Sequence, residues 1–282
     1  MADVIAVDVG GTKLSAGIVR ADGALTARFD APTMHGTDAD ALFATLTGLV
    51  DQLDRTGACA VGIGCGGPMD AHGEHVSPLN IPAWRDFPLR ARLAAYTNLP
   101  AWLDNDAKAI ALGEGWCGAA QGVRDYLAMT VSTGVGGGIV LDGRLLDGAS
   151  GNAGHIGHVI VEPAGHICPC GARGCLEAEA SGSAIARLTG RPAKEAPTEV
   201  RERTGTLVGR AVASVANLLD LQLAVVSGSV ALGFGDVFFT AAQREIDASC
   251  RLAFSRGTRI VPGALGPSGP LIGAARVALI HL

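Results

Sequence analysis

The sequence has no long hydrophobic run, no basic cluster and no recognisable leader. No apolar stretch reaches the roughly 18 residues that a membrane-spanning helix needs, so we expect no membrane partner. The N-terminus lacks a basic region followed by a long apolar core, which predicts no signal peptide and a cytoplasmic location. A net charge of −5 without a basic run argues against nucleic acid as the main partner.

The sequence also lacks an even set of cysteines that could form a disulfide framework. It has seven cysteines, and three of them lie within eight residues, at Cys168, Cys170 and Cys175. This distribution fits thiols in a reducing cytosol, some of them held by a metal, better than it fits disulfides. The others are scattered, and we expect them to be small core residues: Cys59, Cys65, Cys117 and Cys250.

Glycine, in contrast, is abundant. The forty glycines cluster instead of recurring at a short period, which excludes a collagen-like chain and indicates tight turns and backbone close to a ligand. The 282 residues are 48% hydrophobic and 17% charged, which is typical of a compact protein of about two domains.

Strand and helix patterns alternate along the chain and predict an α/β fold. Three antiparallel strands are expected first, joined by glycine-containing turns, and four further strands follow: residues 4–9, 14–19, 25–29, 60–64, 101–103, 223–226 and 259–261. Helices are expected at residues 38–53, 106–116, 206–219, 237–248 and from 271 onward. The polar stretch 191–203 is expected to be a mobile surface segment.

One segment repeats the plan of another. Residues 130–143, "TVSTGVGGGIVLDG", follow the same order as residues 6–23, "AVDVGGTKLSAGIVRADG": a strand, a Gly-rich turn, Gly-Ile-Val and an Asp-Gly turn. Chance similarity between Gly-rich hairpins is one explanation. The other is a duplicated α/β domain with two hairpins facing each other across a cleft, where their N–H groups could hold a chain of phosphates.

Four motifs in a fixed order resemble the ROK family of sugar kinases and sugar-responsive repressors. They are "DVGGTK", "STGVGGG", "LDNDAKAIALGE" and "GHIGHVIVEPAGHICPCGARGCLEAEASG". The resemblance implies a duplicated ribonuclease H-like fold of the actin, heat-shock-70 and hexokinase type, with a cleft between two domains. We place the N-terminal domain at residues 1–106 plus 270–282 and the C-terminal domain at 107–269, and the family suggests a homodimer.

The first glycine turn fits phosphate binding. Gly10 and Gly11 let backbone amides point at a phosphate, Thr12 adds a hydroxyl donor, and Lys13 supplies a charge or is simply solvated. Asp8 precedes them and more plausibly holds Mg²⁺ through water than touches phosphate. A plain Gly-Gly hairpin is the alternative. The pattern is neither a Walker motif nor a Rossmann fingerprint.

The second turn and a later loop complete the nucleotide side. The resemblance implies that the turn contacts phosphate and that the loop 227–230 carries adenosine; the residues concerned are Thr133, Gly134, Gly136, Gly228 and Ser229. ATP is the donor that the family suggests, with polyphosphate as an alternative.

Asp106 is the candidate catalytic base. A sugar hydroxyl that attacks a phosphoryl group must lose its proton, and a carboxylate at a helix N-terminus stays ionised to accept it. Asn105 can donate to and accept from sugar hydroxyls. Helix capping is the alternative role for both residues, and Asp104 is expected to be structural.

A Cys3His set predicts a structural zinc site. One histidine is followed by Cys-x-Cys and a third cysteine, and the four ligands are His158, Cys168, Cys170 and Cys175. Redox pairing is the competing reading, but Cys-x-Cys is an awkward disulfide spacing and one thiol would remain. His166 lies close by and is interpreted as a loop residue.

The zinc segment is also expected to form part of the sugar site. The family turns His158 and Glu177 toward sugar hydroxyls, whereas a solvated Glu177 is the alternative; Gly67 and Asn80 match further sugar-side loops. Family kinases commonly carry glutamate three residues before the zinc histidine, but this sequence has His155 there, which changes the donors and acceptors offered to sugar. Trp84 fits either the core or the cleft rim.

The leading hypothesis is an ATP-dependent hexose kinase that acts at O6, with glucose as the first substrate and N-acetylmannosamine or N-acetylglucosamine as the second. A repressor is less well supported, because strand residues begin at Val4 and leave no room for a DNA-binding region. A sugar sensor that His155 has rendered inactive is the third interpretation.

Overall fold

The computed structural model describes residues 3–282, which divide into two compact units. Unit 1 comprises residues 3–117, 147–153 and 267–282, and unit 2 comprises residues 118–146 and 154–266. The predicted boundaries, after residue 106 and before residue 270, differ from these. The first helix after residue 106 groups with unit 1, because it packs along the C-terminal helix.

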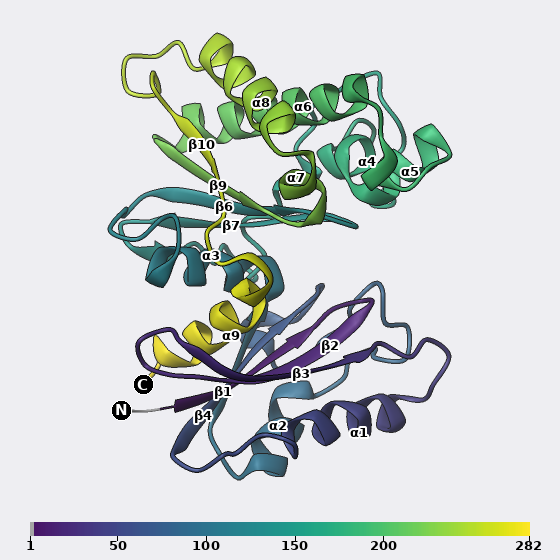
Figure 1. The fold of residues 1–282 in the computed structure, drawn as a ribbon, viewed down its shortest axis with the longest axis vertical. Helices are drawn as coiled ribbons and strands as arrows, with labels where there is room; N and C mark the ends of the chain where they lie inside the picture. Colours follow the sequence, from purple (N-terminus) through teal and green to yellow (C-terminus); the bar gives the residue numbers. More distant parts are fainter. Residues whose placement is uncertain (1–2) are drawn as a thin grey trace. The chain divides into compact units, whose positions relative to one another are not determined.

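Unit 1 is built on one five-stranded sheet (Figure 1). Its strands are β1 Asp3–Val9, β2 Lys13–Val19, β3 Leu25–Pro32, β4 Ala58–Cys65 and β5 Ala101–Asn105, in the order β3-β2-β1-β4-β5. The first three strands are antiparallel, as predicted, whereas β1, β4 and β5 are parallel. Parallel strands end at one edge of a sheet, so residues that follow β1, β4 and β5 are brought together.

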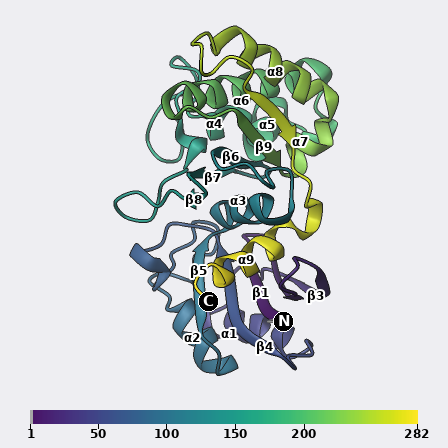
Figure 2. The ribbon, with the colours of Figure 1, turned by 90° about the vertical axis from the view of Figure 1, so that its left-hand side faces the viewer.

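Helices cover both faces of this sheet. On one face lie α1 Ala39–Val50 and α2 Leu89–Thr97, and on the other lie α3 Asp106–Cys117 and α9 Gly269–Leu279 (Figures 1 and 2). Alternate residues of β1 enter the two cores: Ile5 and Val7 face α1, whereas Val4 and Ala6 face α9. Trp84 belongs to the core, because its side chain is completely buried.

Unit 2 repeats the topology of unit 1. Its strands are β6 Tyr126–Val131, β7 Val135–Leu141, β8 Arg144–Leu145, β9 Leu223–Ser227 and β10 Arg259–Pro262, in the order β10-β9-β6-β7-β8. The β6–β7–β8 hairpins correspond to β1–β2–β3, and the parallel strands β9 and β10 correspond to β4 and β5. The duplication that the sequence repeat predicted is confirmed.

The helices of unit 2 pack mainly around one large core. They are α4 Leu176–Ala180, α5 Gly182–Thr189, α6 Thr198–Leu219, α7 Ser229–Phe234 and α8 Asp236–Ser249. Figure 1 shows α6 and α8 side by side, and the contact is close: a Cβ on Gly209 would lie 2.4 Å from the Ala242 carbonyl oxygen. Single 3₁₀ turns complete the fold at Ala71–Gly73, Ile156–His158, Ala193–Glu195 and Gly266–Ser268.

The prediction of a mobile segment at 191–203 is wrong. Helix α6 begins at Thr198, and a short 3₁₀ turn precedes it. The polar residues form the exposed side of the helix, while Thr204 is buried and its hydroxyl donates to the Val200 carbonyl at 2.7 Å. The polar composition of this segment therefore marks a solvent-facing helical turn and not a mobile segment.

Within residues 3–282, no helix combines the length and the hydropathy needed to cross a membrane. All seven cysteines are unpaired; Cys65 and Cys250 are buried and Cys59 and Cys117 are partly buried.

The packing of α9 on β4 gives a test of the fold. A Cβ on Gly62 would lie 2.0 Å from the Ala274 carbonyl oxygen, so Gly62→Ala forces the helix away from the sheet. We expect a loss of about 3 kcal/mol in the free energy of unfolding. Urea denaturation followed by tryptophan fluorescence measures it, because all three tryptophans lie in unit 1.

Gly48→Ala is the matched control. Gly48 lies on the exposed side of α1 with no atom within 4 Å of its would-be Cβ, so alanine there is expected to stabilise by about 0.5–1 kcal/mol. Equal effects of the two substitutions would contradict the proposed packing.

Candidate functional site

Two carboxylates meet at the carboxyl ends of the parallel strands of unit 1. Asp8 lies opposite Gly64 in the β1–β4 register, and Asp106 begins α3 directly after β5. A Cβ on Gly64 would lie 3.7 Å from Asp8 Oδ1 and 3.6 Å from the Cα of Asp106. The glycine thus provides the space in which the two acidic residues approach each other.

This proximity changes the acidity of Asp8. Burial, together with the negative charge of Asp106, raises the pKa of the Asp8 carboxyl to about 7, against the smaller opposing effects of Lys13 and Arg28. A cation stabilises a partly buried acidic pair of this kind. Oxygen ligands of this kind suit Mg²⁺, so the donor set fits the magnesium that the sequence predicted here.

The Gly10–Lys13 turn lies next to Asp8 and is held by Thr33, the residue that follows β3. The Gly10 N–H donates to the Lys13 carbonyl at 3.0 Å, and the buried Thr33 hydroxyl donates to the Gly10 carbonyl at 2.7 Å. Lys13 is half exposed, with Nζ 3.7 Å from Asp30 Oδ1. The turn is therefore fixed by its own strands, while the lysine remains accessible.

Position 11 has no room for a side chain larger than that of glycine. It does not adopt a positive φ, but a Cβ at this position would lie 2.5 Å from the Cβ of Asn80. The Asn80 loop thus packs directly on the glycine turn. A larger residue at position 11 would displace a loop that the sequence assigned to the sugar side.

Asn105 acts as a helix cap and keeps donors for another partner. Its Oδ1 accepts from the N–H groups of Ala107 at 3.0 Å and Lys108 at 3.3 Å. The capping alternative is thus correct for its oxygen, whereas its amide nitrogen lies 3.6 Å from where a Cβ on Gly67 would be. Asp106 Oδ1 accepts from the Ala107 N–H at 2.8 Å, which orients the carboxylate.

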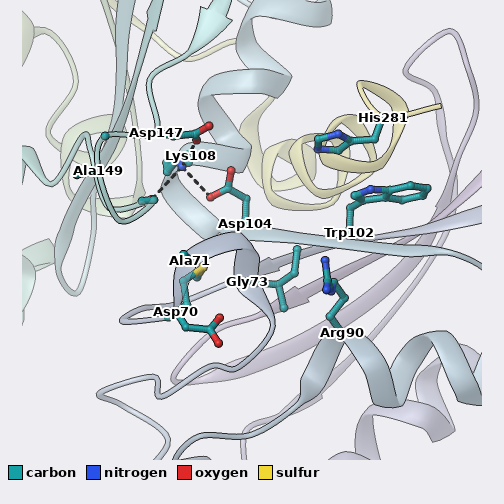
Figure 3. A pocket seen from close by; sticks show the side chains of 14 residues that line it. Asp70, Ala71, Gly73, Arg90, Trp102, Asp104, Lys108, Asp147, Ala149 and His281 are labelled. Atoms are coloured by element: carbon teal, nitrogen blue, oxygen red, sulfur yellow. Dashed lines mark hydrogen bonds and ion pairs between the residues drawn. The ribbon is translucent and has the colours of Figure 1, made fainter.

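A buried lysine holds the start of α3 to the segment 147–153. The Lys108 ammonium, 3% exposed, lies 3.1 Å from Asp104 Oδ1 and 2.8 Å from Asp147 Oδ1, and donates to the Gly151 carbonyl at 3.0 Å (Figure 3). Asp104 Oδ1 also accepts from the Asn105 N–H at 2.7 Å. Asp104 is therefore structural, as expected, and it fixes the backbone just before Asp106.

The second glycine turn is tied to Glu177. In unit 2 the Glu177 carboxylate accepts from the Val135 N–H at 3.0 Å, and a Cβ on Gly134 would lie 2.9 Å from its Oε2. Glu177 is partly buried, so the alternative of a solvated surface charge does not hold. Thr133 and Gly136 flank this contact, the latter inside β7.

The loop after β9 lies beside the same turn. Gly228 has φ +100, and a Cβ there would lie 2.4 Å from the Val131 carbonyl oxygen. Only glycine combines that backbone conformation with so close an approach. The Ser229 and Ser132 hydroxyls are 3.0 Å apart, so the predicted adenosine loop is linked to the second turn.

The four predicted zinc ligands converge. Their ligand atoms all lie within 4.8 Å of one another, with His158 Nδ1 3.7 Å from Cys168 Sγ and Cys170 Sγ 3.7 Å from Cys175 Sγ. A tetrahedral zinc site with Zn–S bonds of about 2.3 Å places its ligand atoms about 3.8 Å apart. The residues therefore fit zinc, with Nδ1 as the histidine ligand and Nε2 directed elsewhere.

Glu179 anchors the segment that carries the zinc ligands, a role that the sequence motifs did not indicate. Its buried carboxylate accepts from the His166 N–H at 2.6 Å, pairs with His166 Nδ1 at 2.9 Å and accepts from Arg203 Nη2 at 2.6 Å. These hydrogen bonds hold the pKa of the Glu179 carboxyl below its usual value despite burial. His166 is thus a loop residue anchored to α4, as expected, and not a ligand in the zinc set.

His155 lies next to the zinc histidine. It precedes the 3₁₀ turn Ile156–His158, which packs on β7, since a Cβ on Gly157 would lie 2.3 Å from the Val135 carbonyl oxygen. The rings of His155 and His158 are stacked with centroids 6.1 Å apart. His155 is exposed, so its side chain can contact a ligand that lies against His158.

The predicted site residues therefore form two clusters, one in each unit. Unit 1 brings together the first glycine turn, Asp8, the sugar-side loops and the start of α3; unit 2 brings together the second turn, the β9 loop, Glu177 and the zinc segment. The sequence motifs did not indicate the anchoring roles of Lys108, Thr33 and Glu179. The available signal for the first was a lysine four residues after Asp104, in the first turn of the expected helix.

Comparison with known proteins agrees with these motifs. The sequence matches the ROK family over residues 4–280. It is 32% identical to a glucokinase of Thermotoga maritima, over 97% of this chain and 96% of that protein. It is 39% identical to an N-acetylmannosamine kinase of Citrobacter koseri, over 82% of this chain and 84% of the relative.

A solved structure extends the agreement to the fold. The ROK family glucokinase from Streptomyces griseus, determined in complex with glucose and AMPPNP, matches with a TM-score of 0.83 and 29% identity, over 97% of this chain and 98% of that one. The expectation of a duplicated α/β fold of the hexokinase type is thereby confirmed. Motif order, duplicated topology and full-length similarity agree, and the chain belongs to the ROK family.

Proposed function

We propose that the protein transfers the γ-phosphoryl group of ATP to the O6 hydroxyl of a hexose, with Asp106 as the general base. That the chain is a sugar kinase follows from relatives that are a glucokinase and an N-acetylmannosamine kinase over most of its length. The finer assignment rests on one observation, the pairing of Asp8 and Asp106 beside the Gly10–Lys13 turn.

Asp106 is suited to accept the proton of an attacking hydroxyl. One oxygen is held by the Ala107 N–H, which leaves the carboxylate oriented at the N-terminus of α3. The helix dipole favours its ionised form, and a carboxylate that accepts a proton as phosphoryl transfer proceeds lowers the barrier. Asn105, whose oxygen caps α3, offers its amide N–H groups to sugar oxygens.

The glycine turns, Asp8 and Mg²⁺ are assigned to the nucleotide. Backbone N–H groups of the Gly10–Lys13 turn and the 133–136 turn donate to phosphate oxygens, and the Gly228–Ser229 loop receives adenosine. When bound with ATP, Mg²⁺ neutralises phosphate charge, and Asp8 would hold it through water. Bound magnesium would also lower the raised pKa of Asp8, because a cation favours the carboxylate.

Zinc is assigned a positional role. A closed Cys3His site has no open position for substrate, so the metal would fix the loop that carries His158. His158 would then present Nε2 to a sugar hydroxyl, and Glu177 on α4 is assigned to the sugar as well. In unit 1, Gly67 and Asn80 are the residues assigned to the sugar. Metal coordination at Nδ1 sets which ring nitrogen remains for the substrate.

His155 is the residue that we assign to sugar choice. Glucose is the first candidate and a 2-acetamido hexose, N-acetylmannosamine or N-acetylglucosamine, is the second. An imidazole offers one donor and one acceptor, whereas the glutamate common in the family offers only acceptors. A sugar whose C1–C2 region presents both a donor and an acceptor therefore fits this protein, and we propose that it works in the cytoplasm as a homodimer.

Asp106→Asn tests the catalytic assignment. Asparagine keeps the hydrogen bond from the Ala107 N–H but cannot accept the proton, so kcat should fall by roughly 10²–10⁴-fold while sugar binding and the unfolding midpoint stay near wild type. ATP consumption coupled to each of a panel of hexoses provides the rate, and calorimetry provides the sugar affinity.

Two outcomes of that experiment would overturn the proposal. Turnover of Asp106→Asn within about fivefold of wild type would remove Asp106 as the base. Sugar binding by the wild-type protein without sugar-dependent ATP consumption would favour the non-catalytic sensor instead.

Glu179→Gln tests the zinc loop. Glutamine keeps the size of the side chain but replaces an acceptor oxygen by a donor, which leaves an N–H of His166 or Arg203 without its partner. We expect zinc release to a chromophoric chelator to quicken by about tenfold or more. Glu199→Gln, an exposed change on α6, is the control and should release zinc at the wild-type rate. Equal rates for both variants would contradict the bracing role.

A further inference from the structure

A cavity of about 470 Å³ lies within unit 1, beside the ion pairs of Lys108 with Asp104 and Asp147 (Figure 3). Strand β5 supplies Trp102 and Asp104 to its wall, α2 supplies Arg90, and the C-terminal segment supplies His281. The volume lies in the range of roughly 300–1,000 Å³ that small-molecule sites occupy. None of its lining residues belongs to the sugar and nucleotide groups assigned above.

One wall of the cavity is aromatic. The rings of Trp102 and His281 are stacked, with centroids 5.7 Å apart and planes inclined by 10° (Figure 3). His281 is exposed and Trp102 is partly buried. Both residues line the cavity, so they offer it an apolar surface against which the C–H groups of a ligand can pack.

The polar lining combines both signs of charge. Asp70, Asp104 and Asp147 contribute carboxylates, and Lys108 and Arg90 contribute cations. Lys108 is occupied by Asp104, Asp147 and the Gly151 carbonyl, and Arg90 pairs with Glu74 at 3.2 Å. Asp104 is one-fifth exposed and, among the described residues, donors reach only its Oδ1, so Oδ2 is left as an acceptor.

This chemistry selects a neutral polyhydroxy ligand. Three carboxylates disfavour phosphates and other anions, and the two cations disfavour a simple metal ion. A sugar matches the lining, because its C–H face can lie on an aromatic ring while its hydroxyls donate to Asp104 and accept from Arg90. We propose that this cavity is a second, non-catalytic binding site for a neutral mono- or disaccharide.

Two residues of the cavity wall, Asp104 and Lys108, connect the site to the start of α3, where Asp106 lies. Asp104 Oδ1 accepts from the Asn105 N–H, and Lys108 lies on α3 a half-turn after Asp106. A sugar that hydrogen-bonds to Asp104 therefore acts on residues directly bonded to the catalytic helix. The binding itself does not require phosphoryl transfer, so failure of the kinase assignment would leave this proposal standing.

The three tryptophans make the site directly observable. In a ¹H–¹⁵N NMR titration with glucose, N-acetylmannosamine or maltose, the Trp102 indole resonance, assigned with Trp102→Phe, should shift saturably. The resonance of the buried Trp84 should stay in place. His281→Ala, at an exposed position, should raise the dissociation constant obtained from the Trp102 titration by about threefold to tenfold. Inorganic phosphate should produce no shift.

A second variant distinguishes sugar binding in the Trp102 cavity from sugar binding at the active site. His155→Ala alters the sugar site assigned in unit 2, and the Trp102 titration should keep its wild-type midpoint in that variant. A midpoint that moves with His155→Ala would show that Trp102 merely reports active-site occupancy. A Trp102 resonance that no sugar shifts would overturn the site, and a shift with phosphate alone would overturn its ligand class.

Discussion

The approach of Asp8 to Asp106 is the constraint on which the structure of the site depends. Like charges in a poorly solvated place repel, and burial together with this repulsion raises the pKa of the Asp8 carboxyl to about 7. The sheet enforces the approach, because β1 and β5 end on either side of β4, with Gly64 between them. Such an arrangement costs stability in the free protein, and a bound cation would offset that cost.

The surrounding residues hold this pair in place through backbone contacts. Thr33, just after β3, fixes the first glycine turn, Asn105 caps α3, and Lys108 secures Asp104 and the segment 147–153. In unit 2 buried or partly buried carboxylates hold the loops in a similar way. Glu177 secures the second glycine turn, and Glu179 secures the zinc segment. In each case a partly or fully buried side chain determines the position of a segment that carries predicted ligand-binding groups.

Much of this organisation could be predicted from the sequence because its signals are local. The repeat of strand, glycine turn and Gly-Ile-Val predicted two equivalent sheets, and Cys-x-Cys with a nearby histidine predicted four converging ligands. The bracing residues could not be predicted in this way. Glu179 and Lys108 are charged residues within helices, and only tertiary contacts distinguish a buried anchor from a solvated charge. The prediction of a mobile segment at 191–203 was wrong for the converse reason, since its polar residues from Thr198 onward lie on the exposed side of a helix.

The charge state of Asp8 tests the central claim most directly. A ¹³C NMR titration of the Asp8 carboxyl in metal-free protein should give a pKa of about 7, and saturating Mg²⁺ with a non-hydrolysable ATP analogue should lower it, because the cation favours the carboxylate. A metal-free pKa near the ordinary 3.8, or one unmoved by the magnesium complex, would show that the two carboxylates do not form the cation-dependent pair described above.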